Sequence, residues 1–311
     1  MSAKIFKSVD EQIEILKAKG LVFNDYDFAR DIILRENYFF LNGYRSPFLV
    51  TGSKRFIEGT TFEEIYALFK FDRFFRNIIF KNVLIVENNY KSIFSYVVSK
   101  KYGYKERDYL NVNNFDNSRE KIKQINDLIR KLKRQIRING YQHGATSHYI
   151  NNYGYIPLWV GVKVLSFGLM GELFSILKQE DKEEIVSYYK GIDTESFGDY
   201  LSILSNYRNL CAHEDILYNH ETQKGISPTP IHSFLDIPMV DDEYIYGVHD
   251  IFALIIILKQ VLSFTDFKMM MNEIDYEIDW LSSKLKTIDI KKVLYRMGFP
   301  DNYKQISYYG E

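Results

Sequence analysis

One stretch of this 311-residue sequence places an arginine, an amide and a histidine within six positions: Tyr207-Arg208-Asn209-Leu210-Cys211-Ala212-His213. Apolar residues flank it, with Ile203-Leu204 before the arginine and Ile216-Leu217 after the histidine, and their spacing predicts a helix over residues 196–219. A guanidinium can fork onto phosphate oxygens, and an imidazole can transfer a proton near neutral pH. The stretch therefore predicts a site for chemistry on a phosphodiester.

The spacing within this stretch raises a geometric question. Arg208 and His213 are five residues apart, which separates them by about 140° around an ideal helix. They converge only if the helix bends or ends there, if Arg208 reaches around it, or if a second copy of the motif faces the first. Cys211 points away from His213 because the two are two residues apart, so we expect it to be a packing residue rather than a nucleophile.

The composition, with 46% hydrophobic and 26% charged residues, is typical of a soluble globular protein. Cys211 is the only cysteine, so no disulfide can form within the chain, as is usual in a reducing cytoplasm. The longest apolar run, residues 251–258, is too short to cross a bilayer. We therefore expect a cytoplasmic protein that does not enter a membrane.

The pattern of breakers and apolar residues predicts an all-α protein. No glycine or proline occurs over residues 60–102, which predicts one long helix or two in tandem, with Glu64 and Asp72 on its surface. Ser8 with Glu11 and Thr61 with Glu64 form capping boxes. No stretch alternates long enough to predict a sheet. We expect an N-terminal helical lobe over residues 1–58 and a helical body over 59–311, with further helices over residues 25–36, 117–139 (capped by Asn117-Ser118), 157–178, 182–189, 248–264, 266–285 and 288–297.

Charge is unevenly distributed along the chain, although the net charge is only −1. Residues 119–137 contain eight basic and two acidic residues, whereas residues 236–280 contain ten acidic residues and two lysines. An apolar seam of Ile122, Ile125, Ile129, Leu132 and Ile136 predicts that one face packs and the others are solvated. The free faces are either simply solvated or follow an RNA backbone. The candidate RNA-binding residues are Arg119, Lys121, Lys123, Arg130, Lys131, Lys133, Arg134 and Arg137, with Arg73 and Arg76 as further candidates.

No candidate metal or nucleotide site is evident from the sequence. His143 and His148 lack neighbouring cysteine or carboxylate partners, and no glycine-rich phosphate-binding loop occurs. We expect no metal and no cofactor, and we expect residues 141–154 to form a loop.

The motif resembles that of a known family. Arg208, Asn209 and His213 fill the Arg-Asn-x-x-x-His signature of HEPN ribonucleases, and the longer context, residues 204–213 followed by Leu217-Tyr218-Asn219, resembles the AbiD/AbiF branch of bacterial abortive-infection proteins. Other stretches agree in order along the chain: Glu11-Gln12-Ile13, Asn37 to Tyr44, Phe71-Asp72-Arg73 with Arg76, Pro157 to Val160, Leu165 to Gly168 and Met297 to Pro300.

This resemblance implies a HEPN-type helical bundle with additional N-terminal and C-terminal helices, acting in phage defence as a metal-independent endoribonuclease. It implies a homodimer with a composite site, in which Arg208 holds the phosphate, Asn209 orients the reacting groups and His213 acts as base or acid. The alternative is a non-catalytic RNA-binding protein that forms a ribonucleoprotein with a small structured non-coding RNA, which controls its toxicity. A third reading is purely structural: Arg208 pairs with a carboxylate and His213 is a core histidine.

Overall fold

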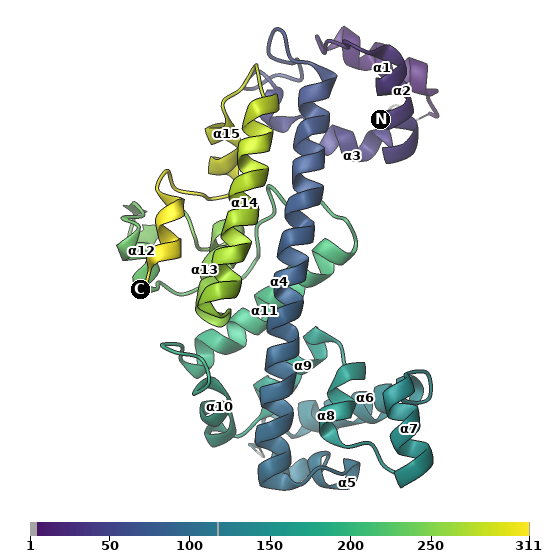
Figure 1. The fold of residues 1–311 in the computed structure, drawn as a ribbon, viewed down its shortest axis with the longest axis vertical. Coiled ribbons are helices and arrows are strands. Elements are labelled where there is room, and N and C mark those ends of the chain that lie inside the picture. The colour runs from purple at the N-terminus through teal and green to yellow at the C-terminus, as the bar shows by residue number, and fades with distance from the viewer. Residues whose placement is uncertain (1–4, 117, 311) are drawn as a thin grey trace.

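One long helix, α4 (Phe62–Tyr102), runs along the molecule (Figure 1). The computed structural model describes residues 5–116 and 118–310. The Thr61 side chain accepts a hydrogen bond from the Glu64 N–H at the start of α4, and Gly103, with a φ of 97°, ends the helix. Its 41 residues, at 1.5 Å each, make α4 about 60 Å long. Of the two alternatives predicted for this segment, the single helix is confirmed.

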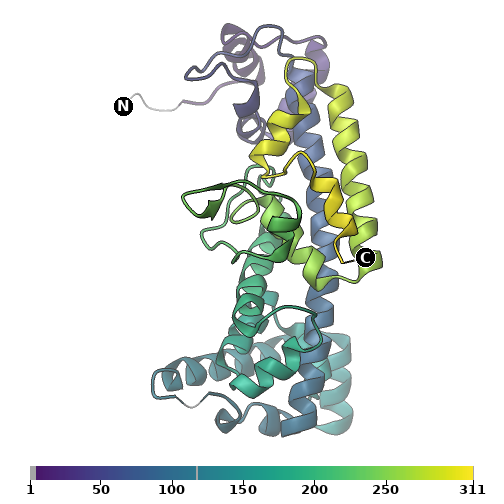
Figure 2. The ribbon, with the colours of Figure 1, turned by 90° about the vertical axis from the view of Figure 1, so that its left-hand side faces the viewer.

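The prediction of a surface position is wrong for Glu64. Its side chain is buried, and Oε1 accepts hydrogen bonds from the backbone N–H groups of Lys286 and Thr287, both at 2.7 Å. The carboxylate therefore caps α4 and also ties the start of that helix to the chain that follows α14 (Phe264–Lys284). Figures 1 and 2 show α14 lying along α4 over much of its length.

Short helices precede α4 and pack at its N-terminal end (Figure 1). Both predicted capping boxes are present, and at the first of them Ser8 and Glu11 exchange their hydrogen bonds. The segment between α3 and α4 contains a single antiparallel bridge, between Leu49 and Phe56. These elements are α1 (Val9–Ala18), α2 (Tyr26–Glu36), α3 (Tyr38–Gly43) and the 3-10 turn η1 (Ser46–Phe48).

The opposite end of α4 is surrounded by the helices of residues 106–186, at the bottom of Figure 1. They are α5 (Glu106–Tyr109), η2 (Val112–Asn114), α6 (Ile122–Gly140), α7 (Gly144–Tyr153), α8 (Leu158–Gly161), η3 (Val162–Val164), α9 (Phe167–Ile176) and α10 (Gln179–Val186).

Two predictions for this region are wrong. Residues 144–153 form the helix α7 instead of a loop. Residues 157–178 do not form one helix, because the Lys91 ammonium donates to the Leu165 carbonyl (2.7 Å) and Ser166 then caps the separate helix α9. Gly168 allows α9 to approach α11 (Thr194–Ala212) closely, since a Cβ there would lie 3.1 Å from the Ser205 Oγ.

The remaining chain packs α13 (Ile251–Val261) between its neighbours, and residues 251–258 and Val261 of this helix are buried. The apolar run over residues 251–258 is therefore core, and no helix of the described chain combines the length and apolarity that a membrane crossing requires. The other elements are α12 (Pro230–Phe234), the two-residue antiparallel strands β1 (Met239–Val240) and β2 (Glu243–Tyr244), α15 (Ile290–Arg296) and η4 (Tyr303–Tyr308).

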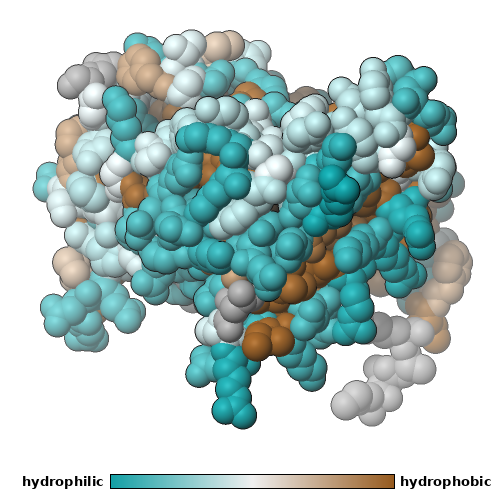
Figure 3. Space-filling model, turned by 90° about the horizontal axis from the view of Figure 1, so that it is seen from below, coloured by the Kyte–Doolittle hydropathy of each residue, from teal (hydrophilic) through white to brown (hydrophobic). Residues whose placement is uncertain are grey.

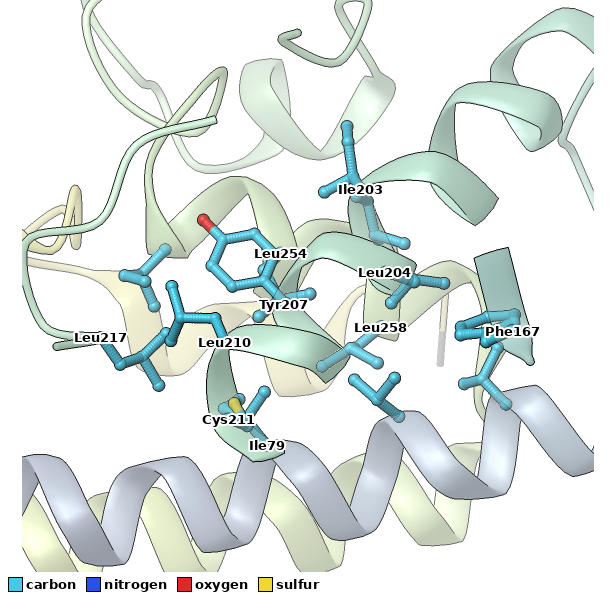
Figure 4. Packing of buried hydrophobic residues seen from close by; sticks show 14 of the residues in the cluster. Ile79, Phe167, Ile203, Leu204, Tyr207, Leu210, Cys211, Leu217, Leu254 and Leu258 are labelled. Atoms are coloured by element: carbon cyan, nitrogen blue, oxygen red, sulfur yellow. The ribbon is translucent and has the colours of Figure 1, made fainter. Parts of the chain in front are cut away.

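Helices account for 66% of the described residues, so the all-α prediction is confirmed. The buried apolar residues form one connected cluster that extends from Ile13 to Ile306. Helix α11 crosses α4 and packs against α4, α9 and α13 (Figures 1 and 4). Residues 207–213 therefore lie at the end of a helix that is held on several sides.

Candidate functional site

Helix α11 presents the Arg-Asn-His motif (Arg208, Asn209 and His213) in its last turn. Tyr207, Leu210 and Cys211 point into the core among residues of the neighbouring helices (Figure 4). Their burial fixes the rotation of the helix about its axis. Asn209 and His213 are both exposed, and they lie on one side of the helix because they are four residues apart.

The prediction of a helix to residue 219 is wrong. Helix α11 ends at Ala212 with His213 as its C-cap residue, and Glu214 adopts the left-handed conformation, with a φ of 56°. The Glu214 N–H bonds to the Cys211 carbonyl (3.4 Å) and the Asp215 N–H to the Leu210 carbonyl (3.2 Å), which is a Schellman arrangement. The helix therefore ends at the motif, which is one of the conditions that the spacing sets for bringing Arg208 and His213 together.

The buried clamp, formed by Tyr44, Asp72 and Arg76, holds the chain that follows the motif. The Asp72 carboxylate accepts hydrogen bonds from the backbone N–H groups of Leu217 (3.1 Å) and Tyr218 (2.7 Å) and from the Tyr44 hydroxyl (2.6 Å). Arg76 pairs with the same carboxylate and donates to the Asp215 carbonyl at 3.1 Å. Residues 215–218 therefore cannot continue the helix, because buried groups of α3 and α4 hold them elsewhere.

This arrangement corrects two predictions. Asp72 is buried instead of lying on the surface, and Arg76 is only 2% exposed, so it is not accessible to an RNA backbone. Burial raises the pKa of Asp72, and Arg76, Tyr44 and the two N–H groups oppose that rise. Two features of the sequence point to the clamp residues: the i, i+4 spacing of Asp72 and Arg76, and their place, with Tyr44, in the stretches that resemble the family.

The motif arginine reaches toward α4, whereas the next residue, Asn209, is exposed to solvent. Its Nε lies 3.8 Å from the Glu87 Oε2, and its guanidinium carbon lies 5.8 Å from the centre of the Phe80 ring. Glu87 is shared, since its other oxygen binds the Lys91 ammonium at 2.6 Å. No hydrogen bond or ion pair joins Arg208 to His213 within the described chain.

The Arg208–Glu87 pair is loose. The Glu87 Oε2 and the Arg208 Nε are both buried atoms without a hydrogen-bond partner, and the Arg208 side chain is 37% exposed. A guanidinium in this state keeps donors for a phosphate. Half of the purely structural reading thus applies, because Arg208 does pair with a carboxylate, but His213 is exposed and is not a core histidine.

The remaining candidate cations differ in whether a carboxylate neutralises them. Arg73 makes two hydrogen bonds to Glu36, at 2.9 and 2.8 Å, and lies 3.5 Å from Glu214. On and just before α6, Lys121 pairs with Asp116, Arg130 with Asp127 and Lys131 with Glu172. In contrast, five cations are exposed and make no ion pair with the described residues: Arg119, Lys123, Lys133, Arg134 and Arg137.

Helix α6 packs by an apolar seam close to the predicted one. Ile125, Ile129, Leu132 and Ile136 are buried, but Ile122 is 47% exposed and Leu128 is buried in addition. The helix begins at Ile122 instead of residue 117, and the predicted cap residue Asn117 lies outside the described residues. The basic faces of α6 are therefore turned outward, as the seam predicts.

Cys211 is buried, and burial raises the pKa of its thiol to about 12, so its predicted packing role is confirmed (Figure 4). His143 precedes α7 and His148 lies within it. Over residues 5–116 and 118–310, no three His, Cys, Asp or Glu side chains are grouped as metal ligands.

These features define an all-α protein whose long helix α4 and crossing helix α11 carry a polar motif at a fixed helix end. The chain belongs to the Abi-like protein family, whose model matches residues 31–219. That range contains the buried clamp, Glu87 and the Arg-Asn-His motif. Membership places the protein among abortive-infection proteins, which act in phage defence. Comparison with curated proteins and with solved structures finds no match.

Proposed function

We propose that this protein is an endoribonuclease of the HEPN type, in which Arg208, Asn209 and His213 cleave RNA without a metal ion during phage defence. The observation that carries the proposal is the exposed end of α11. There an imidazole and an amide face solvent, the residue before the amide carries a loosely held guanidinium, and the buried clamp holds the backbone of residues 215–218 directly after the motif. Preorganised polar groups on a rigid frame are what phosphoryl chemistry needs.

The reaction follows from RNA carrying its own nucleophile. The 2′-oxygen forms a bond to phosphorus as a base takes its proton, and the bond from phosphorus to the 5′-oxygen breaks as an acid protonates that oxygen. His213 serves as base or acid. Arg208 stabilises the charge of the phosphorane through its free donors, and Asn209 orients the histidine or the phosphate through its amide.

A homodimer completes this site. The reaction needs a base and an acid together, whereas each chain offers one histidine in the motif. The Arg208 guanidinium is turned toward Glu87 of its own chain and makes no bond to its own His213. In a two-fold dimer the motif of one protomer faces the motif of its partner, which supplies the second imidazole.

The decisive experiment measures cleavage and thermal stability on the same preparation of His213→Ala. We expect cleavage to fall by roughly 10²–10⁴-fold, with little change in melting temperature because the side chain is exposed. His249→Ala, which removes another exposed histidine, is the matched control and keeps its activity. Products should carry a 2′,3′-cyclic phosphate and a 5′-hydroxyl, form in the presence of EDTA, and not form from a substrate with 2′-deoxy at the cut site. Wild-type cleavage per folded His213→Ala molecule would refute the catalytic role.

The second candidate is a non-catalytic RNA-binding protein that holds a small structured RNA. The exposed and unpaired cations of α6 favour it, because they offer phosphate contacts at a distance from the motif. The two candidates differ in one result. If a defined RNA co-purifies with the protein and no RNA is cleaved under any condition, with the His213→Ala variant binding that RNA like the wild type, the second candidate holds.

A further inference from the structure

A large groove, distinct from the Arg-Asn-His motif, lies at the end of the molecule that carries α5, α6 and α7. Its volume is about 1150 Å³. The motif contacts α4 at Glu87, and the groove lies beyond the end of α4 at Tyr102. Fifteen residues of helix separate these two points, which is about 20 Å.

The walls of this basic groove carry an excess of positive charge. Five of its six charged lining residues are cations: Lys105, Arg107, Lys133, Arg134 and Arg137. The sixth, Glu106, is already engaged, because its carboxylate accepts the Ile156 N–H at 2.7 Å.

Three cations of α6 lie in the groove without an ion pair, and of the cations outside the groove Arg119 and Lys123 are also unpaired among the described residues. The three in the groove, Lys133, Arg134 and Arg137, have no ion pair with the described residues, whereas Lys121, Arg130 and Lys131 outside the groove are each paired with a carboxylate. Exposed cations held close together repel one another. An anionic ligand relieves that repulsion, and a polyanion relieves it at several points at once.

The floor and rim of the basic groove are apolar and aromatic. Leu110, Ile136 and Ile156 line it together with Tyr141 and Tyr155. Tyr141 is 65% exposed, and the Lys105 ammonium lies 4.8 Å from the centre of the Tyr155 ring. Figure 3 views this end of the molecule and shows a strip of hydrophobic surface between hydrophilic side chains.

We infer that the basic groove binds unpaired nucleotides of RNA, with phosphates on its cations and bases against Tyr141 and the apolar floor. A duplex stacks the faces of its bases inside, where side chains cannot reach them, so an aromatic rim and an apolar floor favour a strand whose bases are free. The inference rests on the proposed RNA function and adds Lys105, Arg107, Tyr141 and Tyr155 to the candidate residues. An RNA held there is anchored at a distance from the motif, so the groove sets affinity rather than the rate of the chemical step.

The test compares two triple variants of α6 in the His213→Ala background, so that cleavage does not consume the RNA. The groove variant is Lys133→Gln with Arg134→Gln and Arg137→Gln. The control variant is Lys121→Gln with Arg130→Gln and Lys131→Gln, which removes the same charge from α6 and the residue directly before it, outside the groove. Binding of a short fluorescein-labelled oligouridine RNA and of an RNA duplex of equal length is measured by anisotropy over a range of salt concentrations, with circular dichroism to confirm equal folding.

The parent protein should bind the single strand more tightly than the duplex. The groove variant should lose at least about tenfold in affinity for the single strand and flatten the salt dependence by about two, since each phosphate contact contributes about 0.7 to the slope. The control variant should lose less than about threefold. Tyr141→Ala should lower the affinity for the single strand about fivefold or more, which is the lower end of what stacking of one base contributes. Tyr141→Phe keeps the aromatic ring and should bind like the parent.

Several results would overturn the inference. Equal losses in the two triple variants would show that net charge, and not the groove, binds RNA. A preference for the duplex with no effect of Tyr141→Ala would show that the helix follows a duplex backbone. Tighter binding of a polyglutamate peptide than of RNA would make the groove a protein site. If the parent binds neither RNA, the proposed function fails with the inference, whereas RNA binding that is indifferent to the groove variant removes the groove alone.

Discussion

The buried clamp beneath the motif gives the sharpest prediction about stability. Asp72→Asn removes the carboxylate charge but keeps the size of the side chain. Arg76, which is 2% exposed, then has no ionic partner, and the N–H groups of Leu217 and Tyr218 lose their charged acceptor. Breaking a buried ion pair from one side costs about 3–5 kcal/mol. We expect the free energy of unfolding to fall by about 3 kcal/mol, since the asparagine oxygen still accepts one of the hydrogen bonds.

The assay is urea unfolding followed by circular dichroism at neutral pH, with two comparison proteins. Glu273→Gln breaks the exposed Lys81–Glu273 pair, in which the side chains are 54% and 39% exposed, and should cost less than about 1 kcal/mol. Asp72→Asn combined with Arg76→Met removes both charges. It should be more stable than Asp72→Asn alone, because two apolar or neutral side chains leave no buried charge unpaired.

The same variant connects the clamp to the site. With residues 215–218 released, the end of α11 loses the backbone contacts that fix His213, so cleavage per folded molecule should fall along with stability. If Asp72→Asn unfolds at the same urea concentration as Glu273→Gln, the clamp does not hold the loop and the argument for a preorganised motif fails.

Three further predictions follow from the site and its frame. Since the composite site needs the imidazoles of both protomers, mixing equal amounts of wild-type and His213→Ala protein should leave about a quarter of the cleavage of the same total amount of wild type, because about a quarter of the random dimers hold both imidazoles; a value of about a half would place the site within one chain. Glu87→Gln combined with Lys91→Met removes the acid that competes with phosphate for the Arg208 guanidinium, without leaving an unpaired lysine at position 91. RNA affinity, measured by anisotropy, should therefore rise roughly two- to fivefold. An unchanged affinity would show that Glu87 does not compete for Arg208. Gly298→Ala should destabilise the fold by several kcal/mol more than Gly191→Ala in thermal unfolding. Both glycines have a positive φ, but a Cβ at Gly298 would lie 2.1 Å from the Asp250 carboxylate, whereas one at Gly191 meets nothing within 4 Å. Equal melting temperatures of the two variants would refute this.

The elements that could be predicted from the sequence are those whose cause is local. The long helix α4 follows from a segment without glycine or proline that begins at a capping box. The run at residues 251–258 is apolar all round, and it is the buried helix α13. In both cases the residues that decide the structure are neighbours in the chain.

The elements that could not be predicted depend on distant partners. The predicted helix over residues 157–178 is divided because Lys91 of α4 takes the Leu165 carbonyl. The end of α11 is set by Asp72, which is more than a hundred residues away in the chain. No pattern within a short window of sequence contains these contacts.

For the basic helix α6, an excess of basic residues was the sequence signal for RNA binding. Residues 119–137 carry an excess of positive charge, but the structure divides that charge in two. Asp116, Asp127 and Glu172 neutralise Lys121, Arg130 and Lys131, and one of those acids, Glu172, comes from α9. Lys133, Arg134 and Arg137, in the C-terminal half of α6, have no ion pair with the described residues. They line the basic groove together with Lys105 and Arg107. A count of charges along the sequence treats all eight basic residues as equal, whereas the pairing pattern predicts that only the groove side of α6 contributes to the salt dependence of RNA binding.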